Sequence, residues 1–310
     1  MRAPPHDHPR AAALLAVIWL IAILAITTMS ALRVISFDVE VASAKIHGSR
    51  ARHLAEMGIA VGANPAVMRS DPLLQQFDGE TREGFQVRLI SEGGRFNLNA
   101  ILLQEDESLL LSIFTYWGLE LDEAQEIIDA LGDWVDADEE VRLNGAEIDY
   151  YEGLGRINQP FNRPFYDIDE ARLVRGMDLI ESLRPDWRNW FTIWSSGALD
   201  LNEASAELIA AAAEISPEES AIIPELVRGM DGIRDTEDDE PFENPASALD
   251  LLGINADARP DLARRFTVDD AVTRIESTGM AEGAKRRITV IVRNRAGRPA
   301  LLERTEEIVP

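Results

Sequence analysis

HPRAAALLAVIWLIAIL, residues 8–24, begins an apolar run that carries no charged residue from Ala11 to Leu32. A helix needs about 20 apolar residues to cross the hydrocarbon core of a bilayer, so this run is long enough to span a membrane. A cleaved secretory signal has a short apolar core that is followed by a break and a small-residue cleavage site, and this run has no break. We therefore expect a retained membrane helix from Ala12 to Leu32.

The helical pattern continues beyond the membrane run. No proline interrupts residues 33–62, and apolar residues recur close to the helical period at Ile35, Val39, Ala42, Ile46, Leu54, Ala55 and Val61. Pro65 ends the pattern. The sequence predicts one helix from about Ala12 to about Val61, roughly 75 Å long at 1.5 Å per residue. A plain secretory signal cut near Ala31 is the alternative interpretation.

The composition excludes several classes of enzyme. The chain has 310 residues and no cysteine, and all four histidines lie at or before His53. Thiol chemistry is therefore excluded, and the body of the chain lacks the histidine that Ser-His-Asp and Cys-His hydrolases require. The same lack of histidine and cysteine disfavours a zinc enzyme. The formal net charge of −25 argues against nucleic-acid binding, because phosphates are bound by Lys and Arg.

The body contains two groups of strands with a helical stretch between them. GFQVRLISEGGRFNLNAI, residues 84–101, contains an alternating strand and a glycine turn at Gly93-Gly94. SLLLSIFTYWGL (108–119) and LDEAQEIIDALGDWV (121–135) predict amphipathic helices. Three more strands, separated by GMAEG and RAGR turns, are expected at 271–278, 285–294 and 299–308. The predicted class is α+β: a long helix packed on an antiparallel sheet, with a helical domain inserted between the strands.

The helical stretch contains a repeated pattern. Three motifs recur in one order: FNLNA (96–100) with LDLNEA (199–204), the acidic loops GDWVDADEE (132–140) and MDGIRDTEDDE (230–240), and Pro-Phe at 164–165 and 241–242. Gly176 and Gly253 each follow the proline by twelve residues. The order predicts two related modules, about 96–177 and 199–254. Chance similarity among acidic helical segments is the alternative.

DWVDADEEVRLNGAEIDYYEG, residues 133–153, is the most chemically distinctive segment. Residues 104–152 contain sixteen Asp or Glu and a single basic residue, Arg142. Carboxylates at this density repel one another, so they either remain solvated or hold a cation. Calcium takes six to eight oxygen ligands and suits such a loop, although the EF-hand spacing is not met. The candidate ligands are Asp133, Asp136, Asp138 and Glu147, with a weaker second set at Asp231, Asp235, Asp238 and Asp239.

Paired carboxylates also permit glycoside hydrolysis, which requires aromatic residues that stack on sugars. Trp187, Trp190 and Trp194 have the spacing of one helical face. Such a stripe belongs more often to a core or an interface than to a substrate platform, so the chain is predicted not to be an enzyme.

Five segments, spread over nearly the whole chain, resemble protein K of type II secretion systems, the family of large minor pseudopilins. The segments are RAAALLAVIWLIAIL (10–24), GGRFNLNA (93–100), DALGDWVDADEEVRLNGAEIDYY (129–151), RPFYDIDEARLVRGM (163–177) and LDLNEAS (199–205). The resemblance implies a pilin-like domain with a large inserted all-α domain, SAM-like and duplicated. The expected division is a prepilin-type leader (1–11), a membrane and stem helix (12–65), pilin-like strands (66–103), the insert (104–265) and further strands (266–310).

The resemblance also implies a function and its partners. Proteins of this family are minor pseudopilins at the tip of a periplasmic pseudopilus, where they prime its assembly for the export of folded proteins. The implied partners are the minor pseudopilins I, J and H, the major pseudopilin, the prepilin peptidase and inner-membrane lipid, but no nucleic acid. Calcium bound in the inserted domain is implied as well, and Asp133, Asp136, Asp138 and Glu147 are the matching residues.

The leader departs from the family pattern at its cleavage point. Ala11 stands where the leader peptidase expects glycine, so the mature chain would begin at Ala12. Most pilins carry glutamate as the fifth mature residue, and here that residue is Ala16. An unpaired carboxylate is costly in a bilayer, so Ala16 suits a subunit with no neighbour above it.

The expected location is the bacterial inner membrane. The basic leader would remain in the cytoplasm, which gives a single-pass protein with its body in the periplasm. A protein of another class also fits the residues: a membrane-anchored periplasmic protein that acts alone, by binding calcium or by carboxylate-based hydrolysis.

Overall fold

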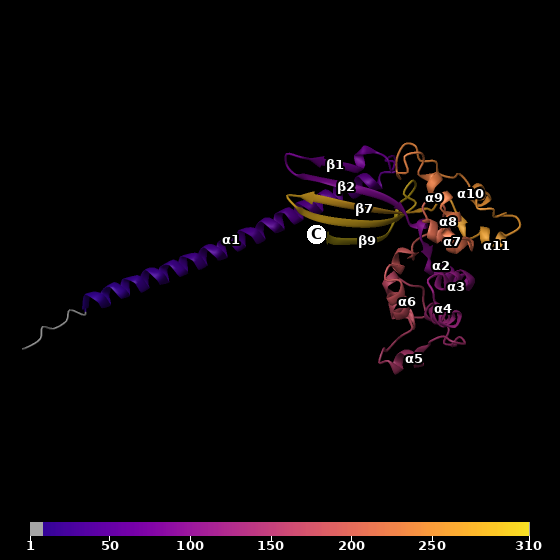
Figure 1. The fold of residues 1–310 in the computed structure, drawn as a ribbon, viewed down its shortest axis with the longest axis horizontal. Coiled ribbons are helices and arrows are strands. Elements are labelled where there is room, and N and C mark those ends of the chain that lie inside the picture. The colour runs from indigo at the N-terminus through magenta and orange to yellow at the C-terminus, as the bar shows by residue number, and fades with distance from the viewer. Residues whose placement is uncertain (1–8, 310) are drawn as a thin grey trace, which may run out of the picture.

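A computed structural model of the chain describes residues 9–309. The predicted leader, residues 1–11, therefore lies mostly outside the described residues. Helix α1 (Pro9–Ala63) is one unbroken helix of 55 residues, and it extends as a rod from the body of the molecule (Figure 1). The prediction of a single continuous helix is confirmed, with its ends two or three residues beyond the predicted ones.

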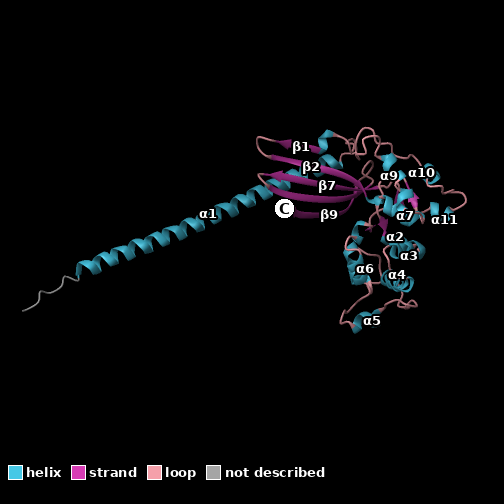
Figure 2. Ribbon diagram, in the orientation of Figure 1, coloured by secondary structure: helices cyan, strands magenta, loops and turns pink. Residues whose placement is uncertain are grey.

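Five antiparallel strands form the main sheet, in the order β1-β2-β7-β8-β9 (Figure 2). The strands are β1 (Gln75–Asp78), β2 (Glu83–Ser91), β7 (Val272–Ala281), β8 (Ala284–Arg293) and β9 (Ala300–Val309). Because β2 pairs with β7, the sheet joins chain segments on either side of the helical stretch. The structure confirms the four predicted strands, whereas the short edge strand β1 was not predicted.

The predicted GMAEG turn is wrong in its extent. Gly279, Met280 and Ala281 belong to β7, and only Glu282 and Gly283 form the turn, with φ of 47° and 88°. Positive φ at both central residues is typical of the tight two-residue hairpins whose twist matches that of the strands. The pairing of β7 with β8 therefore continues up to Ala281 and Ala284.

The last turns of α1 pack directly on the sheet. Gly58 and Gly62 face β2 and β7, where an added Cβ would lie 2.9 Å from Val87 in either case. Gly279 faces the helix in return: an added Cβ would lie 2.0 Å from the Ala51 carbonyl oxygen and 2.4 Å from the Ala55 nitrogen. These positions accept only hydrogen, and helix and strand backbones meet there.

Arg295, between β8 and β9, closes the end of α1. Its Nε donates to the Gly62 carbonyl at 2.7 Å, and its Nη2 donates to the carbonyls of Asn64 and Val67 at 2.6 Å. The last carbonyls of a helix have no partner within the helix, and a cation also favours that end of the helix dipole. The C-terminal sheet therefore supplies the cap of the N-terminal helix.

The segment between β2 and β7, here called the insert (residues 92–271), is mostly helical. Its helices are α2 (Leu98–Leu103), α3 (Glu107–Tyr116), α4 (Leu121–Val135), α5 (Ile148–Gly153), α6 (Met177–Leu183), α7 (Ala206–Ala213), α8 (Pro217–Ser220), α9 (Ile222–Val227), α10 (Pro245–Leu251) and α11 (Pro260–Ala263). Helices α3 and α4 confirm the two that were predicted.

The insert is not purely helical, because two pairs of two-residue parallel strands occur in it. They are β3 (Phe96–Asn97) with β4 (Phe191–Thr192), and β5 (Leu199–Asp200) with β6 (Phe266–Thr267). The predicted tryptophan face is wrong, because a 3₁₀ turn at Trp187–Asn189 leads straight into β4. Trp187 and Trp190 are buried in the core of the insert instead.

Two matching contacts bear on the predicted duplication. The Asn99 side chain bonds both backbone groups of Phe165, donating to its carbonyl at 2.9 Å and accepting from its N–H at 2.8 Å. Asn202 bonds both backbone groups of Phe242 in the same way, at 3.0 and 2.8 Å. These asparagines and phenylalanines are the ones that the repeated motifs align. The duplication stays a prediction, which these contacts support.

We predict that Gly279→Ala weakens the packing of α1 on the sheet. The added methyl group would collide with helix backbone, and overpacking of this kind destabilises by about 2 kcal/mol. The thermal midpoint of the full chain in detergent, followed by near-UV circular dichroism, should fall by about 5 °C. Gly79→Ala is the matched control, because an added Cβ there meets nothing within 4 Å. Equal midpoints for the two variants would contradict the close contact.

Candidate functional site

Apolar side chains on one face of α1 remain exposed beyond the membrane run. One described helix, Ala13–Ala63, is long and apolar enough to cross a membrane. Beyond Leu32 the apolar side chains of Ile35, Val39 and Ile46 remain 58–62% exposed. With Ala42 they are spaced four, three and four residues apart, which is the seam of a left-handed helix pair. This face of α1 has the pattern of a surface that another helix covers.

The first acidic loop begins where α4 ends, and Asp133 organises it. Its carboxylate is fully buried and accepts hydrogen bonds from the backbone N–H groups of Arg142, at 3.2 Å, and Ala146, at 2.8 Å. Gly145 lies against it, where an added Cβ would be 1.9 Å from Oδ2 of Asp133. Glycine at this position therefore lets the loop wrap around the carboxylate.

Several oxygen atoms around this loop are buried without a hydrogen-bond donor. They are both carboxylate oxygens of Glu147, Oδ1 of Asp136 and the amide oxygen of Asn162. Asn162 is tied to the loop, because its Nδ2 donates to the Asp138 carbonyl at 2.8 Å. All of these atoms are acceptors, so another acceptor cannot satisfy them, whereas a hard cation can.

The pKa values of the loop carboxylates also favour a cation at these oxygens. Burial, together with the nearby charges of Asp133 and Asp136, raises the pKa of Glu147 to about 7. Burial and the charge of Asp138 likewise raise the pKa of Asp136. The one guanidinium beside them, that of Arg142, has its Nε 3.4 Å from Asp133 and 3.7 Å from Asp136, and its Nη1 bonds Glu107. One positive charge faces several negative ones.

The predicted ligands are brought together unequally. The charges of Asp133 and Asp136 raise the pKa of Glu147, and that of Asp138 does so as well although Asp138 is exposed at the rim. Within residues 9–309, no group of three or more His, Cys, Asp or Glu is arranged to hold a metal ion. A cation here would therefore need the amide oxygen of Asn162. The sequence did not predict this residue, which reaches the loop from a separate segment.

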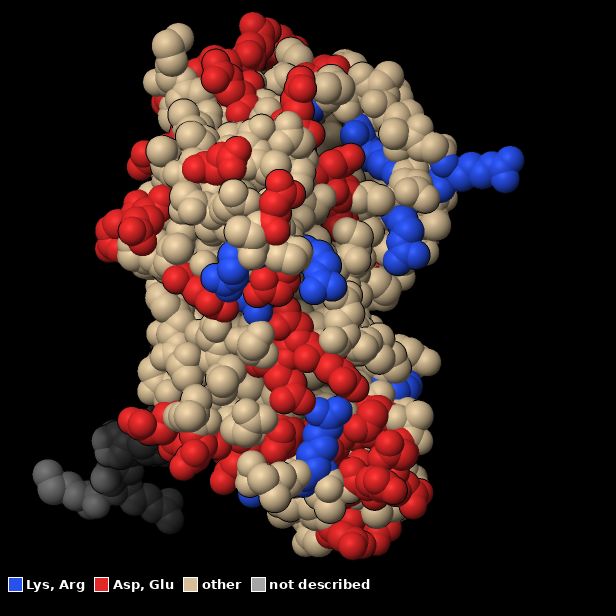
Figure 3. Space-filling view, turned by 90° about the vertical axis from the view of Figure 1, so that its right-hand side faces the viewer, with Lys and Arg blue, Asp and Glu red and all other residues tan. Residues whose placement is uncertain are grey.

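The end of the insert around this loop carries much negative charge. Figure 3 looks at the molecule from the side opposite α1, and Asp and Glu side chains crowd the lower end of that view, where α5 lies in Figure 1. Asp136, Asp138, Glu139 and Glu140 follow α4 within five residues. Their mutual repulsion favours any bound cation at this end.

The second acidic loop differs from the first. Its carboxylates accept hydrogen bonds from their own backbone: Asp231 from Ile233 at 2.7 Å, Asp238 from Asp231 at 3.0 Å, and Asp239 from Asp235 at 2.8 Å. Hydrogen bonds from the Asp231 N–H and the Thr236 hydroxyl lower the pKa of Asp238. Local donors therefore stabilise these charges, which gives this loop less need of a metal ion.

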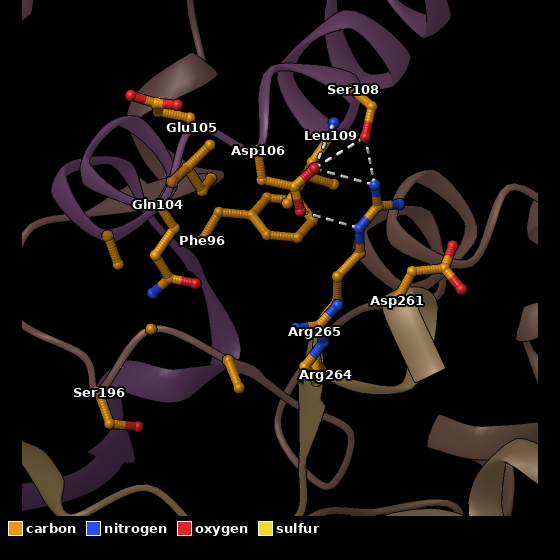
Figure 4. A pocket seen from close by; sticks show the side chains of 14 residues that line it. Phe96, Gln104, Glu105, Asp106, Ser108, Leu109, Ser196, Asp261, Arg264 and Arg265 are labelled. Atoms are coloured by element: carbon orange, nitrogen blue, oxygen red, sulfur yellow. Dashed lines mark hydrogen bonds and ion pairs between the residues drawn. The ribbon is translucent and has the colours of Figure 1, made fainter. Parts of the chain in front are cut away.

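A cavity of about 540 Å³ lies between α2–α3 and α11–β6 (Figure 4). Arg265 bonds both carboxylate oxygens of Asp106 there, from Nε and Nη2 at 3.1 Å. Although burial raises it, the pKa of Asp106 is held below its usual value by hydrogen bonds from Arg265 and Ser108. This carboxylate is held as an ion-paired anion, unlike the protonated acid that glycoside hydrolysis requires.

Comparisons with known proteins agree on one family. Residues 94–185 match the model for the first domain of "Type II secretion system (T2SS), protein K". The chain is 29% identical over 163 residues to type II secretion system protein K of Pseudomonas aeruginosa, across 49% of this chain and 47% of that protein. It is 40% identical over 92 residues to protein K of Klebsiella pneumoniae, across 27% of this chain and 28% of that protein. The matched regions thus span less than half of these relatives.

The fold has a counterpart among solved structures. A chain in the crystal structure of the GspK-GspI-GspJ complex from enterotoxigenic Escherichia coli matches with a TM-score of 0.59 at 18% identity. The match covers 88% of this chain and 98% of that chain. The fold is therefore shared over most of the chain, well beyond the segments in which sequence identity is measurable.

We predict that, in a chelating buffer, the chain loses stability as the pH rises from about 5 to about 7.5. Folded Glu147 keeps its proton up to about pH 7, against a usual value of 4.5, so the folded state binds more protons across this window. Glu147→Gln has no proton to lose, so its thermal midpoint should fall less steeply than that of the unmodified chain. Parallel curves would contradict the assigned environment of Glu147.

Proposed function

We propose that this chain, which belongs to the type II secretion system protein K family, acts as a minor pseudopilin at the tip of a pseudopilus. The observation that carries the proposal is the position of the insert. In Figure 1 it lies at the far end of the sheet from the membrane part of α1. A subunit with so large a body beyond its sheet leaves no room for a neighbour stacked directly above it, and a tip position removes that conflict.

The proposed partners are other pilin-like subunits. The solved counterpart is described as a complex of GspK with GspI and GspJ, and minor pseudopilins I, J and H with the major pseudopilin are the partners proposed here. The exposed seam at Ile35, Val39, Ala42 and Ile46 suits a parallel stem that leaves the same membrane. The prepilin peptidase would cut between Ala11 and Ala12, at the start of that stem.

The proposed location is the inner membrane, with the body in the periplasm. Helix α1 supplies one span, and the basic leader with Arg2 and Arg10 favours the cytoplasm for the N-terminus. This topology places the insert on the side where a pseudopilus grows, and there the tip would prime assembly for the export of folded proteins.

We also propose that calcium stabilises the first acidic loop. Asp136 and Glu147 would hold it, with Asp133 and Asp138 close by and the amide oxygen of Asn162 completing the set. The ion would supply the positive charge that the buried, donor-free oxygens lack. The loop fits the ion because the donor-free atoms of its carboxylates and of Asn162 are all oxygens and no thiol or imidazole is near.

We predict that calcium raises the thermal midpoint of the full chain and that Glu147→Gln removes most of this shift. The reason is that Glu147 has two buried oxygens without donors. A chain titrated with calcium chloride and then with chelator should show a reversible shift. Asp250→Asn, on exposed α10, is the control and should keep it. A shift retained in Glu147→Gln, or absent from the unmodified chain, would contradict the site.

Removal of the insert tests the tip proposal. Ser91 pairs with Thr273 across β2 and β7, so a short glycine-asparagine turn can join Ser91 to Val272 and close the sheet as a hairpin. In a host strain without its own protein K, the shortened chain should enter the membrane but fail to restore normal secretion or pseudopilus length. Immunoblots of membranes give its level. Normal secretion by the shortened chain would contradict a role for the insert at the tip.

A further inference from the structure

A second cavity, of about 440 Å³, lies between the sheet and the second acidic loop. Its lining comes from three parts of the chain that are distant in sequence. Met68 and Arg69 follow α1, Leu89 and Ser91 belong to β2, and the insert supplies most of the rest. Neither the stem seam nor the first acidic loop contributes to it.

The charges that line this cavity do not balance. Six carboxylates face three guanidinium groups: Asp200, Glu203, Asp235, Asp239, Asp269 and Asp270 against Arg69, Arg234 and Arg295. Arg69 and Arg234 both pair with Glu203, and Arg69 also lies 3.8 Å from Asp235. Arg295 is occupied with the end of α1. None of these three guanidinium groups forms an ion pair with Asp200 or Asp239.

Asp200 is the most deeply buried of these unpaired carboxylates, at 3% exposure. Its oxygens receive one backbone hydrogen bond, from Asn202 at 3.0 Å, and a long contact of 3.4 Å from the Ser91 hydroxyl. In the first repeat the corresponding residue is the neutral Asn97, whose amide donates to the Ser195 carbonyl. The cavity therefore contains the carboxylate of Asp200 at the position where the first module has the neutral amide of Asn97.

Asp239 supplies a second incompletely satisfied carboxylate. Its Oδ2 accepts from the Asp235 N–H at 2.8 Å, but its Oδ1 is buried and has no hydrogen-bond donor. Buried carboxylate oxygens without partners are costly, and a cation relieves that cost most directly. The two aspartates line one cavity, so one ligand with one or two positive ends can serve both.

The apolar residues that line the rest of the cavity indicate what kind of cation fits. Met68, Leu89, Val227, Pro241 and Val268 line the same space. A metal ion would neither fill a cavity of this size nor use its apolar walls. An alkyl chain that ends in an ammonium group matches both features, because its methylenes cover apolar walls while its charge meets carboxylates.

We propose that this cavity binds an alkylammonium group, carried either by a lysine side chain of a protein or by a free amine. The ammonium nitrogen donates hydrogen bonds to Asp200 and Asp239, and its alkyl chain packs on Leu89, Val227 and Val268. Binding would join the loop after α1, the sheet and the second acidic loop through one ligand.

The test uses the full chain in detergent micelles at pH 8, with isothermal titration calorimetry. Burial and the charge of Glu203 raise the pKa of Asp200 to about 7, so this carboxylate is ionised at pH 8. Pentylamine and the tripeptide acetyl-Gly-Lys-Gly-amide are the probes, and pentanol is the uncharged control. We expect saturable binding of pentylamine and none of pentanol. Binding of the tripeptide as well identifies a protein lysine as the source, and binding of pentylamine alone identifies a free amine.

Two variants locate the binding. Asp200→Asn and Asp239→Asn should each weaken pentylamine binding about tenfold, the effect of losing one charge-assisted hydrogen bond. Asp250→Asn, outside the cavity, should leave it unchanged. Asp239 lies in a surface loop, so its variant tests the site even if Asp200→Asn does not fold. The proposal is overturned if neither amine binds saturably, if both variants bind like the unmodified chain, or if calcium occupies the site in place of the amine.

Discussion

The direct contact between the backbone of α1 and that of β7 is the constraint on which the rest of the molecule depends. Gly279 allows it from the strand, while Gly58 and Gly62 let the side chains of β2 and β7 approach the helix closely. Side chains that interdigitate can slide by changing rotamers, but two backbones in contact cannot. The direction of the stem is therefore fixed by the sheet. Arg295 adds a second restraint, because it binds the last carbonyls of α1 from the other end of the chain.

The insert is held in orientation to the sheet by the adjacent strands β2 and β7 and by a buried charge cluster. Glu92, fully buried where β2 ends, accepts hydrogen bonds from Arg274 on β7 at 2.6 Å and from Thr192 on β4. Although burial raises it, the pKa of Glu92 is held below its usual value by Arg95 and Arg274. A buried carboxylate with two guanidinium partners resists separation, because breaking it would leave an unpaired charge in the interior. This cluster therefore ties the insert to the sheet on which the stem packs.

The parts that the sequence predicted correctly are those in which one period runs over many residues. The long apolar pattern of α1 and the alternation in β2 and β8 each specify an element without help from distant contacts. The tryptophan face failed because spacing alone cannot show that residues 187–189 form a 3₁₀ turn, after which the chain extends to pair with β3. The acidic loop was recognised from its carboxylates. Asn162 was missed because only folding brings it to Asp138.

The two acidic loops show how one framework handles buried charge in two ways. Asn99 and Asn202 make the same paired bonds to Phe165 and Phe242, so the scaffold around each loop is alike. The first loop leaves carboxylate oxygens without donors at its own centre, where we propose that a cation binds. The second loop satisfies most of its carboxylates locally. In the second module, the carboxylate without an ion-pair partner is that of Asp200, which lines a cavity beside the sheet. Because that cavity also contacts the loop after α1, a ligand there acts on the junction between stem and insert, whereas an ion in the first loop acts on the far end of the insert.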